Sequence, residues 1–487
     1  MLMSDSTTRS ADNPDLLRAV DTCLLPGFDG TSVPDWLRRR LAGGLGGVVF
    51  YAGNVSDLEQ LSQVVDVIRK ENPAALVAID EEGGDVTRLE SASGSSWPGN
   101  LALGAVDDPG LTRTVAAQIG ADLAAAGVNL NLAPVADINS NPQNPVIGVR
   151  SFGGDPERVS VHTAAYVEGL QGAGVAACVK HFPGHGDTGV DSHLDLPVVE
   201  GDLAPALEPF RAATRADTVA MMTGHLRVPA YGPEPATVNP SLIAGVLRRG
   251  LGFDGAVITD ALDMQAIDGG VGMAEGGVLS LAAGADALCL GPAQGDSRTE
   301  AVRSALIAAV QSGRLTEQRL KEAAQRLRRV AAWATPRAGE SGEWNVGLAA
   351  ARRAVRARNL SGLMSAPYVV QLAPEPTIAV GDTPWGLGAV LAESLPGTEN
   401  VRLGEAPEDV EGMLARAGDR PLILVVRDPH RYAWALETAE RILAHRPDAV
   451  LVDMGYPSGL AERADSSMVT HGAARVCAYA AAERLLG

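Results

Sequence analysis

The stretch KHFPGHGDTGVDSHLDLP, residues 180–197, begins where the apolar run of residues 175–180 ends. It holds one lysine, three histidines and three aspartates, and Pro183, Gly184 and Gly186 make a helix here implausible. We therefore predict a strand followed by a long loop that carries acid–base groups. Ionisable residues at the carboxyl end of a buried parallel strand are typical of the active-site face of an α/β barrel.

Similar apolar runs recur on both sides of this stretch. Near-continuous runs of Val, Ile and Leu are typical of parallel strands that are buried on both faces. The runs cover residues 21–28, 46–51, 75–80, 128–133, 175–180, 218–223, 256–260 and 285–290. Segments with helical spacing, such as residues 56–69, lie between them. This alternation predicts a (β/α)8 TIM-like barrel, although a doubly wound sheet would have the same pattern.

The residues at the ends of these runs help to decide between the two folds. Ionisable side chains end or follow five of the runs, at Asp80, Asp137, Lys180 with His181, His225, and Asp260. A barrel builds its active site from the carboxyl ends of its strands, so this placement favours the barrel. The alternative is that the strands simply end in polar residues at the surface.

The chain is expected to have two domains, both of the α/β class. The barrel domain covers residues 1–333, ATPRAGESGE at residues 334–343 has the composition of a linker, and a smaller α/β/α sandwich domain covers residues 344–487. In the second domain we expect strands at residues 368–372, 377–380, 422–426 and 449–453 and a helix at residues 429–445.

The acidic composition argues against two classes of partner. The 487 residues carry a formal net charge of −19, which disfavours nucleic acid and anionic membrane surfaces. No apolar run is long enough to span a membrane and no signal-peptide pattern begins the chain, so a cytoplasmic location is the expectation. Four cysteines without CxxC spacing are expected to be buried thiols (Cys23, Cys178, Cys289 and Cys477).

Three carboxylates and one imidazole have positions that fit catalysis. Asp191 and His193 are two residues apart, so in an extended segment they share a side, and the carboxylate can orient the ring for general acid–base work. Asp260 at a strand end can attack an anomeric carbon, or can cap the next helix. Asp80, also at a strand end, can accept two sugar hydroxyls, and Arg88 can donate to others.

A metal site is the competing interpretation of the histidine-rich loop. His181 and His185 have the four-residue spacing of a zinc-binding helix, but the surrounding proline and glycines argue against that helix. We therefore predict neither a metal nor a cofactor. Arg150, in the stretch VRSF, is on its own more typical of a solvated ion-pair partner.

Taken together, these stretches resemble glycoside hydrolase family 3, in the two-domain form of its β-N-acetylglucosaminidase branch. The segment KHFPGHG followed by the triplet DSH at residues 191–193 is specific to that branch, and residues 222–264 resemble the family's nucleophile region. The similarity extends from about residue 23 to residue 327 and is weaker in the C-terminal part.

The resemblance implies a role for each matching residue. The nucleophile falls on Asp260, and the acid/base is His193 assisted by Asp191. The residues implied to bind the terminal sugar are Asp80, Arg88, Arg150, Lys180 and His181. One position departs from the family: the turn that usually reads EGGRV is EGGDV here, and Asp85 is expected to add negative charge near the barrel mouth.

The implied activity is that of an exo-acting retaining β-N-acetylglucosaminidase acting on peptidoglycan-derived or chitin-derived oligosaccharides, as in peptidoglycan recycling. Its partner is a saccharide that contains N-acetylglucosamine. The aglycone and the oligomeric state are left open. The alternatives are a phosphorylase that uses inorganic phosphate, for which the His–Asp pair is the argument, and a non-catalytic sugar sensor. A β-glucosidase of the same family is disfavoured by the DSH triplet.

Overall fold

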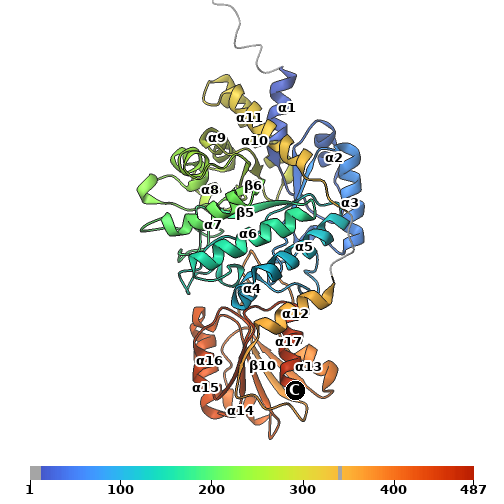
Figure 1. Ribbon diagram of the computed structural model, residues 1–487, viewed down its shortest axis with the longest axis vertical. Coiled ribbons are helices and arrows are strands. Elements are labelled where there is room, and N and C mark those ends of the chain that lie inside the picture. The colour runs from blue at the N-terminus through green and yellow to red at the C-terminus, as the bar shows by residue number, and fades with distance from the viewer. Residues whose placement is uncertain (1–12, 338–342) are drawn as a thin grey trace, which may run out of the picture. The chain divides into compact units, whose positions relative to one another are not determined.

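The computed structural model describes residues 13–337 and 343–487, which form two compact units (Figure 1). The first unit contains residues up to 81, residues 112–138 and the described residues from 155 onwards to 337. The second contains residues 82–111, 139–154 and 343–487. The predicted linker is described only at residues 334–337 and 343, because residues 338–342 lie outside the described residues.

The first unit is built on eight short parallel strands. They are β1 (Leu24–Leu25), β2 (Gly47–Phe50), β3 (Leu76–Ile79), β4 (Leu130–Asn131), β5 (Ala176–Phe182), β6 (Ala220–Thr223), β7 (Ala256–Thr259) and β8 (Leu288–Cys289). Strands β2 to β7 form one sheet in sequence order, and β8 pairs with β1. Ile258 bridges to Ala287 next to β8, and the Val49 amide donates to the Pro26 carbonyl after β1, so the sheet curls and closes. The predicted barrel is confirmed.

Helices surround these strands (Figure 1). They are α1 (Pro14–Thr22), α2 (Asp35–Ala42), α3 (Leu58–Glu71), α5 (Pro109–Ala125), α6 (Pro156–Gly172), α7 (Ala204–Arg215), a π-helical segment (Ser241–Gly250), α8 (Gln265–Asp268), α9 (Met273–Ala283), α10 (Gly295–Gln311) and α11 (Glu317–Trp333). Helix α3 shows why such segments fold: the Asp57 carboxylate caps its first turn by accepting from the Gln60 amide, and its apolar residues repeat at helical spacing and are buried.

The second unit contains a six-stranded sheet of order β11-β10-β12-β13-β14-β9. Its strands are β9 (Arg356–Arg358), β10 (Tyr368–Leu372), β11 (Glu399–Leu403), β12 (Leu422–Val426), β13 (Val450–Asp453) and β14 (Ser466–Val469). Only β9, at one edge, runs antiparallel to its neighbour. Alternate residues of β10 face opposite sides: Val369 joins one apolar cluster, and Val370 joins another.

Helices cover both faces of this sheet (Figure 1). One cluster includes residues of α12 (Trp344–Ala354), α13 (Gly388–Ser394) and α17 (Arg475–Leu486). The other includes residues of α14 (Val410–Ala415), α15 (Ala433–His445) and α16 (Leu460–Arg463). Helix α4 (Asn100–Val106) belongs to the same unit and contacts α12. The predicted α/β/α sandwich is confirmed.

The strand expected at residues 377–380 was wrong. These residues form a turn, in which the Val380 and Gly381 amides both donate to the Thr377 carbonyl. Gly381 has a positive φ of 70°, which ends any extended run. The apolar residues of this stretch resemble those of a strand. The turn follows Pro376, and its backbone amides donate within the turn instead of to a neighbouring strand.

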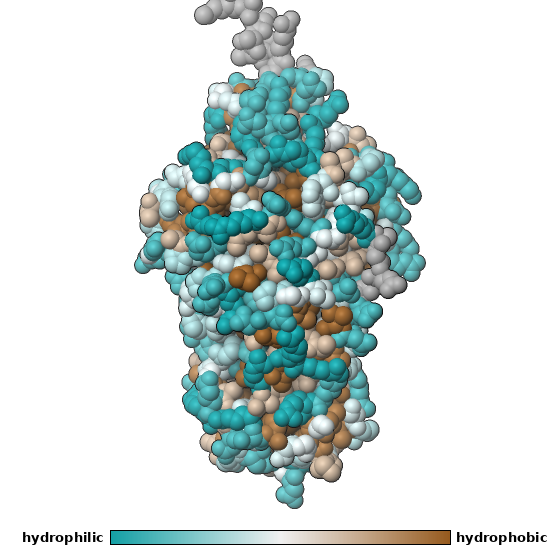
Figure 2. Space-filling model, viewed as in Figure 1, coloured by the Kyte–Doolittle hydropathy of each residue, from teal (hydrophilic) through white to brown (hydrophobic). Residues whose placement is uncertain are grey.

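The face of the molecule in Figure 2 is mainly hydrophilic, with hydrophobic residues in scattered groups. The four cysteines are buried and unpaired, as predicted. Among the residues that the structure describes, no helix is both long enough and apolar enough to cross a membrane.

Candidate active site

The carboxyl ends of the barrel strands hold the ionisable residues that the sequence placed there. Asp80 follows β3, Lys180 and His181 lie in the last part of β5, His225 follows β6, and Asp260 follows β7. Because the strands of this sheet are parallel and adjacent, their carboxyl ends meet at one edge of the barrel.

Asp80 and Lys180 form an ion pair across this edge. The Lys180 Nζ atom lies 2.6 Å from Asp80 Oδ1, and the lysine side chain is only 3% exposed. A buried ammonium group needs such a partner, because burying an unpaired charge is strongly unfavourable. The pair therefore holds the Asp80 carboxylate in a fixed position at the end of β3.

His181 is oriented by a carboxylate outside the predicted site, that of Asp137. The His181 Nδ1 atom lies 2.7 Å from Asp137 Oδ2, so the ring donates this hydrogen bond. Asp137 Oδ1 also accepts from the His185 amide at 2.7 Å. Burial alone would raise the pKa of Asp137, but His181 and His185 more than offset it and hold the pKa below its usual value. Asp137 is thus an ionised anchor for both histidines.

His185 fixes the loop that follows. Its Nδ1 atom lies 2.7 Å from the Thr188 hydroxyl oxygen and its Nε2 atom lies 3.1 Å from that of Ser192. The Thr188 hydroxyl donates to the His185 carbonyl, so Nδ1 donates to Thr188 and Nε2 accepts from Ser192 in the neutral ring. Burial lowers the pKa of His185 to about 4. Both ring nitrogens of this histidine therefore bond to residues of the loop and support it.

This burial predicts a pH-dependent stability that His185 controls. The folded pKa of about 4 lies below the ordinary 6.5, so the unfolded chain binds more protons between these values. Stability from this group is therefore complete above pH 6.5 and is lost as the pH falls towards 4, by roughly 3 kcal/mol. In urea unfolding of the full chain at several pH values, His185→Gln is expected to be less stable at neutral pH and to lose part of this slope. An unchanged slope would contradict the prediction.

Asp191 and His193 form the predicted pair. The His193 Nδ1 atom lies 2.7 Å from Asp191 Oδ1, and the same oxygen accepts from the His193 amide at 2.9 Å. The His193 side chain is 24% exposed and the Asp191 side chain 9%. Burial alone would raise the pKa of Asp191. The hydrogen bond from His193 and the charge of His193 lower the pKa by more than burial raises it, so the carboxyl stays ionised. The carboxylate fixes Nδ1 as the protonated nitrogen and leaves Nε2 for proton exchange.

Asp260 lies within the field of three histidines. Its partial burial would raise its pKa, but His181, His225 and His193, followed by the Ala261 amide, bring the pKa below its usual value. That amide donates to Asp260 Oδ1 at 2.8 Å. Asp260 is not the cap of the next helix, because α8 begins at Gln265 and its N-cap is Met264. The carboxylate is therefore ionised at neutral pH, as a nucleophile must be.

His225 supports the same strand end. Its Nε2 atom donates to the Ala261 carbonyl at 2.9 Å, and its Nδ1 atom lies 2.7 Å from the Thr237 hydroxyl oxygen. Burial lowers the pKa of His225, so the ring is neutral in this position. His225 and Asp137 are the functional residues that the predicted set omitted. Their position at strand ends was the signal that could have included them.

Arg88 and Arg150 belong to the second unit, unlike the other predicted site residues. Arg150 makes a two-fold contact with Glu82, with Nε to Oε2 at 3.0 Å and Nη2 to Oε1 at 2.8 Å, and both side chains are buried. Arg88 Nη2 donates to the Ala379 carbonyl at 2.9 Å. Both guanidinium groups therefore have structural contacts within that unit.

The Arg150–Glu82 pair makes a stability prediction. Arg150→Ala removes the two-fold charge contact that the buried Glu82 carboxylate makes with Arg150, so we expect the second unit to lose about 3–5 kcal/mol of unfolding free energy. The matched control is Arg353→Ala, which breaks the exposed pair with Asp108 in the same unit and is expected to leave the unfolding free energy nearly unchanged. Urea unfolding of the full chain compares them, and similar losses for both would contradict the prediction.

Asp85, the departure from the family's turn, is not an exposed charge. Its carboxylate is buried, lies 2.6 Å from Arg427 Nη2 and accepts from the Ala473 amide at 2.9 Å, all within the second unit. Burial raises the pKa of Asp85 and Arg427 opposes that effect. The expectation that Asp85 adds a charge near the mouth was wrong, because Arg427 balances that charge.

Comparison with known proteins agrees with this arrangement. A β-hexosaminidase of Thiobacillus denitrificans is 38% identical over 272 residues, which are 53% of this chain and 74% of that protein. β-Hexosaminidase A of Pseudoalteromonas piscicida is 38% identical over 250 residues, 46% of this chain. Those residues are only 42% of the Pseudoalteromonas protein, so the similarity covers less than half of its length.

A solved structure matches nearly the whole chain. The glycoside hydrolase family 3 β-N-acetylglucosaminidase from Paenibacillus sp. str. FPU-7 superposes with a TM-score of 0.86 at 32% identity, over 97% of this chain and 96% of that one. The model of the glycosyl hydrolase family 3 N-terminal domain matches residues 27–330. These matches show that the chain belongs to glycosyl hydrolase family 3.

Proposed function

We propose that this protein is an exo-acting retaining β-N-acetylglucosaminidase that releases N-acetylglucosamine from peptidoglycan-derived or chitin-derived oligosaccharides. One observation carries the proposal: the Asp260 carboxylate lies at the carboxyl end of β7, and the loop after β5 carries His193, whose Nδ1 atom is held 2.7 Å from Asp191 Oδ1. A nucleophile and a separate proton donor are the two groups that a retaining glycosidase needs.

The proposed reaction has two steps. In the first, Asp260 attacks the anomeric carbon, the glycosidic bond breaks, and His193 gives its Nε2 proton to the leaving oxygen. In the second, His193 takes a proton from water, which attacks the same carbon and releases Asp260. The Asp191 carboxylate stabilises the imidazolium form that gives up the proton, as a carboxylate beside a histidine does elsewhere.

The ion pair at the end of β3 supplies the proposed sugar contacts. Asp80 can accept hydrogen bonds from two hydroxyl groups while its ion pair with Lys180 holds the carboxylate in place. His181 can contribute its second ring nitrogen, because Asp137 holds the first. Fixed polar groups of this kind orient a sugar before the reaction begins.

The relatives named above are β-hexosaminidases, which supports hydrolysis over the phosphorylase alternative and over a non-catalytic sensor. The test is product analysis by proton NMR with an aryl β-N-acetylglucosaminide, N,N′-diacetylchitobiose and a GlcNAc–MurNAc disaccharide. We expect N-acetylglucosamine to appear first as the β anomer. The α anomer as first product would contradict retention, and N-acetylglucosamine 1-phosphate formed in millimolar phosphate would support the phosphorylase instead.

A further inference from the structure

A cavity lies in the first unit at the end of the barrel opposite the catalytic residues. It has a volume of about 320 Å³ and is lined by the segments that lead into β6 and β7, by the end of α7 and by the last two turns of α11. Catalysis on a barrel uses the carboxyl ends of the strands, so this cavity at their amino ends is outside the proposed active site.

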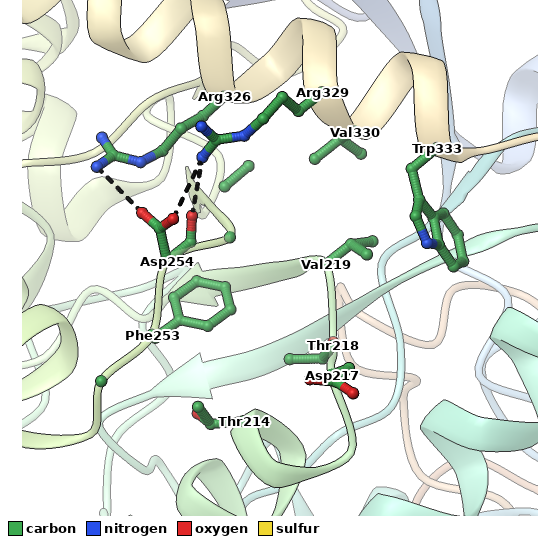
Figure 3. Close-up of a pocket in the computed structure, with 13 residues that line it drawn as sticks. Thr214, Asp217, Thr218, Val219, Phe253, Asp254, Arg326, Arg329, Val330 and Trp333 are labelled. Atoms are coloured by element: carbon green, nitrogen blue, oxygen red, sulfur yellow. Dashed lines mark hydrogen bonds and ion pairs between the residues drawn. The ribbon is translucent and has the colours of Figure 1, made fainter.

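Part of the cavity wall is apolar and includes an exposed indole. Figure 3 shows Trp333 and Val330 on α11 facing Val219 and Phe253. Trp333 is 41% exposed and is the only aromatic residue among the large exposed hydrophobic side chains of the described chain. An exposed aromatic face in a concave site is a typical binding surface, because it buries apolar area when a ligand covers it.

Charged groups of both signs complete the lining. Two carboxylates, Asp217 and Asp254, and two guanidinium groups, Arg326 and Arg329, give a net charge of zero. Such a balance offers hydrogen-bond acceptors and donors without attracting a ligand of either charge. A neutral ligand with many hydroxyl groups fits this combination better than an anion does.

The carboxylate of Asp254 is held only loosely. Its oxygens lie 3.5 Å from Arg326 Nη2 and 3.6 Å from Arg329 Nη2, and its side chain is 80% exposed (Figure 3). Exposed ion pairs of this length contribute little to stability. The carboxylate can therefore turn towards a ligand hydroxyl at small cost, and a carboxylate can accept two such bonds.

From these observations we infer that the cavity is a second saccharide-binding site, which takes a neutral pyranose ring. The C–H face of the ring lies on the Trp333 indole, and its hydroxyl groups bond to Asp217, Asp254 and Arg329. A volume of 320 Å³ is at the small end of ligand sites, which suits a monosaccharide or disaccharide. The choice of a saccharide among neutral polar ligands rests on the proposed function, since this chain would then meet saccharides as substrates.

The test observes Trp333 directly. The full chain carrying Asp260→Ala, which prevents turnover, is labelled with 5-fluorotryptophan, and the Trp333 fluorine resonance is assigned by its loss in Trp333→Phe. We expect this resonance to shift saturably on titration with N,N′-diacetylchitobiose in the millimolar range. Sorbitol, an acyclic polyol without a flat apolar face, is expected to leave it unmoved. No shift with the disaccharide, or the same shift with sorbitol, would overturn the inference.

Variants identify the contacts. Asp254→Ala is expected to raise the dissociation constant reported by Trp333 about tenfold. Val271→Ala, which removes an exposed apolar side chain of the same unit outside the cavity, is the matched control and is expected to leave it unchanged. Equal dissociation constants for the two variants would contradict the proposed contacts.

Measurements on the Asp260→Ala chain and on the chain that retains Asp260 separate this site from the proposed activity. In a background that retains Asp260, Trp333→Ala is expected to hydrolyse an aryl β-N-acetylglucosaminide at the unaltered rate. A chain that hydrolyses this substrate while its Trp333 resonance does not respond to disaccharide would keep the proposed function and refute the second site. A Trp333 resonance that responds in the Asp260→Ala chain, together with no hydrolysis by the chain that retains Asp260, would do the reverse.

Discussion

Asp260→Ala is expected to lower kcat for β-N-acetylglucosaminide hydrolysis by about 10⁴-fold or more. The substitution removes the group that would form the covalent bond to the sugar, and no other carboxylate follows β7 at the same position. A 10⁴-fold loss corresponds to about 5.5 kcal/mol of transition-state stabilisation. Steady-state hydrolysis of an aryl glycoside measures it.

The control for this prediction is the neighbouring carboxylate of Asp263. Asp263 has an ion-pair partner, because one of its carboxylate oxygens lies 3.6 Å from Arg298 Nη1. Burial raises the pKa of Asp263, so this carboxyl ionises less readily than that of Asp260. Asp263→Ala is expected to cost far less activity. Comparable losses from the two alanine variants would contradict the assignment of Asp260 as nucleophile, because a general disturbance of this strand end would then explain both.

His193→Ala is expected to affect substrates according to their leaving groups. For a natural disaccharide, whose leaving alcohol must be protonated, kcat/KM should fall by about 10²–10⁴-fold. For an aryl glycoside with an acidic phenol the loss should be much smaller, because such a group departs without a proton. Measuring kcat/KM isolates the glycosylation step, in which this proton is needed.

One further variant makes the His193 prediction specific. Asp191→Asn keeps a hydrogen-bonding partner near Nδ1 but removes the charge that stabilises the imidazolium, so its loss should also be larger for the natural substrate. Equal losses on both substrates for His193→Ala would refute the acid role and would indicate that the loop, not the proton, had been disturbed.

The strands of the barrel could be predicted because strands that are buried on both faces consist almost entirely of apolar residues. Seven of the eight observed strands lie within their predicted runs. β5 extends two residues beyond its run, to Phe182. The prediction ended at Lys180 because that residue is charged, whereas in the structure Asp80 neutralises it and the strand continues.

Strands at the edge of the second sheet could not be predicted in this way. β11 (Glu399–Leu403) has mostly exposed or half-buried residues, and β9 (Arg356–Arg358) is fully exposed. Each of these strands pairs with only one neighbour and faces solvent on its other side. Their side chains are therefore not buried, and their sequences contain no apolar run. β14 (Ser466–Val469) begins with two serines and was also missed.

Several residues of the candidate site could be named from the sequence, but most of their contacts could not. The Asp191–His193 contact spans two residues, so local geometry was enough to propose it. His181 and Asp137 are 44 residues apart, and Lys180 and Asp80 are 100 apart. Such pairs depend on strand register and on where each loop turns back, which the apolar pattern does not specify.

The division of the chain into units bears on how the protein could be shortened or recombined. The chain crosses from one unit to the other after residues 81, 111, 138 and 154 and again before residue 343. Residues 82–111 and 139–154 are therefore inserted in the barrel sequence but fold with the C-terminal part, where the Gly347 backbone packs tightly against Ser96. A gene truncated after the barrel would leave both insertions without their core. The C-terminal part therefore cannot be removed as a separate domain. An exchange of the second unit between relatives would have to transfer residues 82–111, 139–154 and 343–487 together.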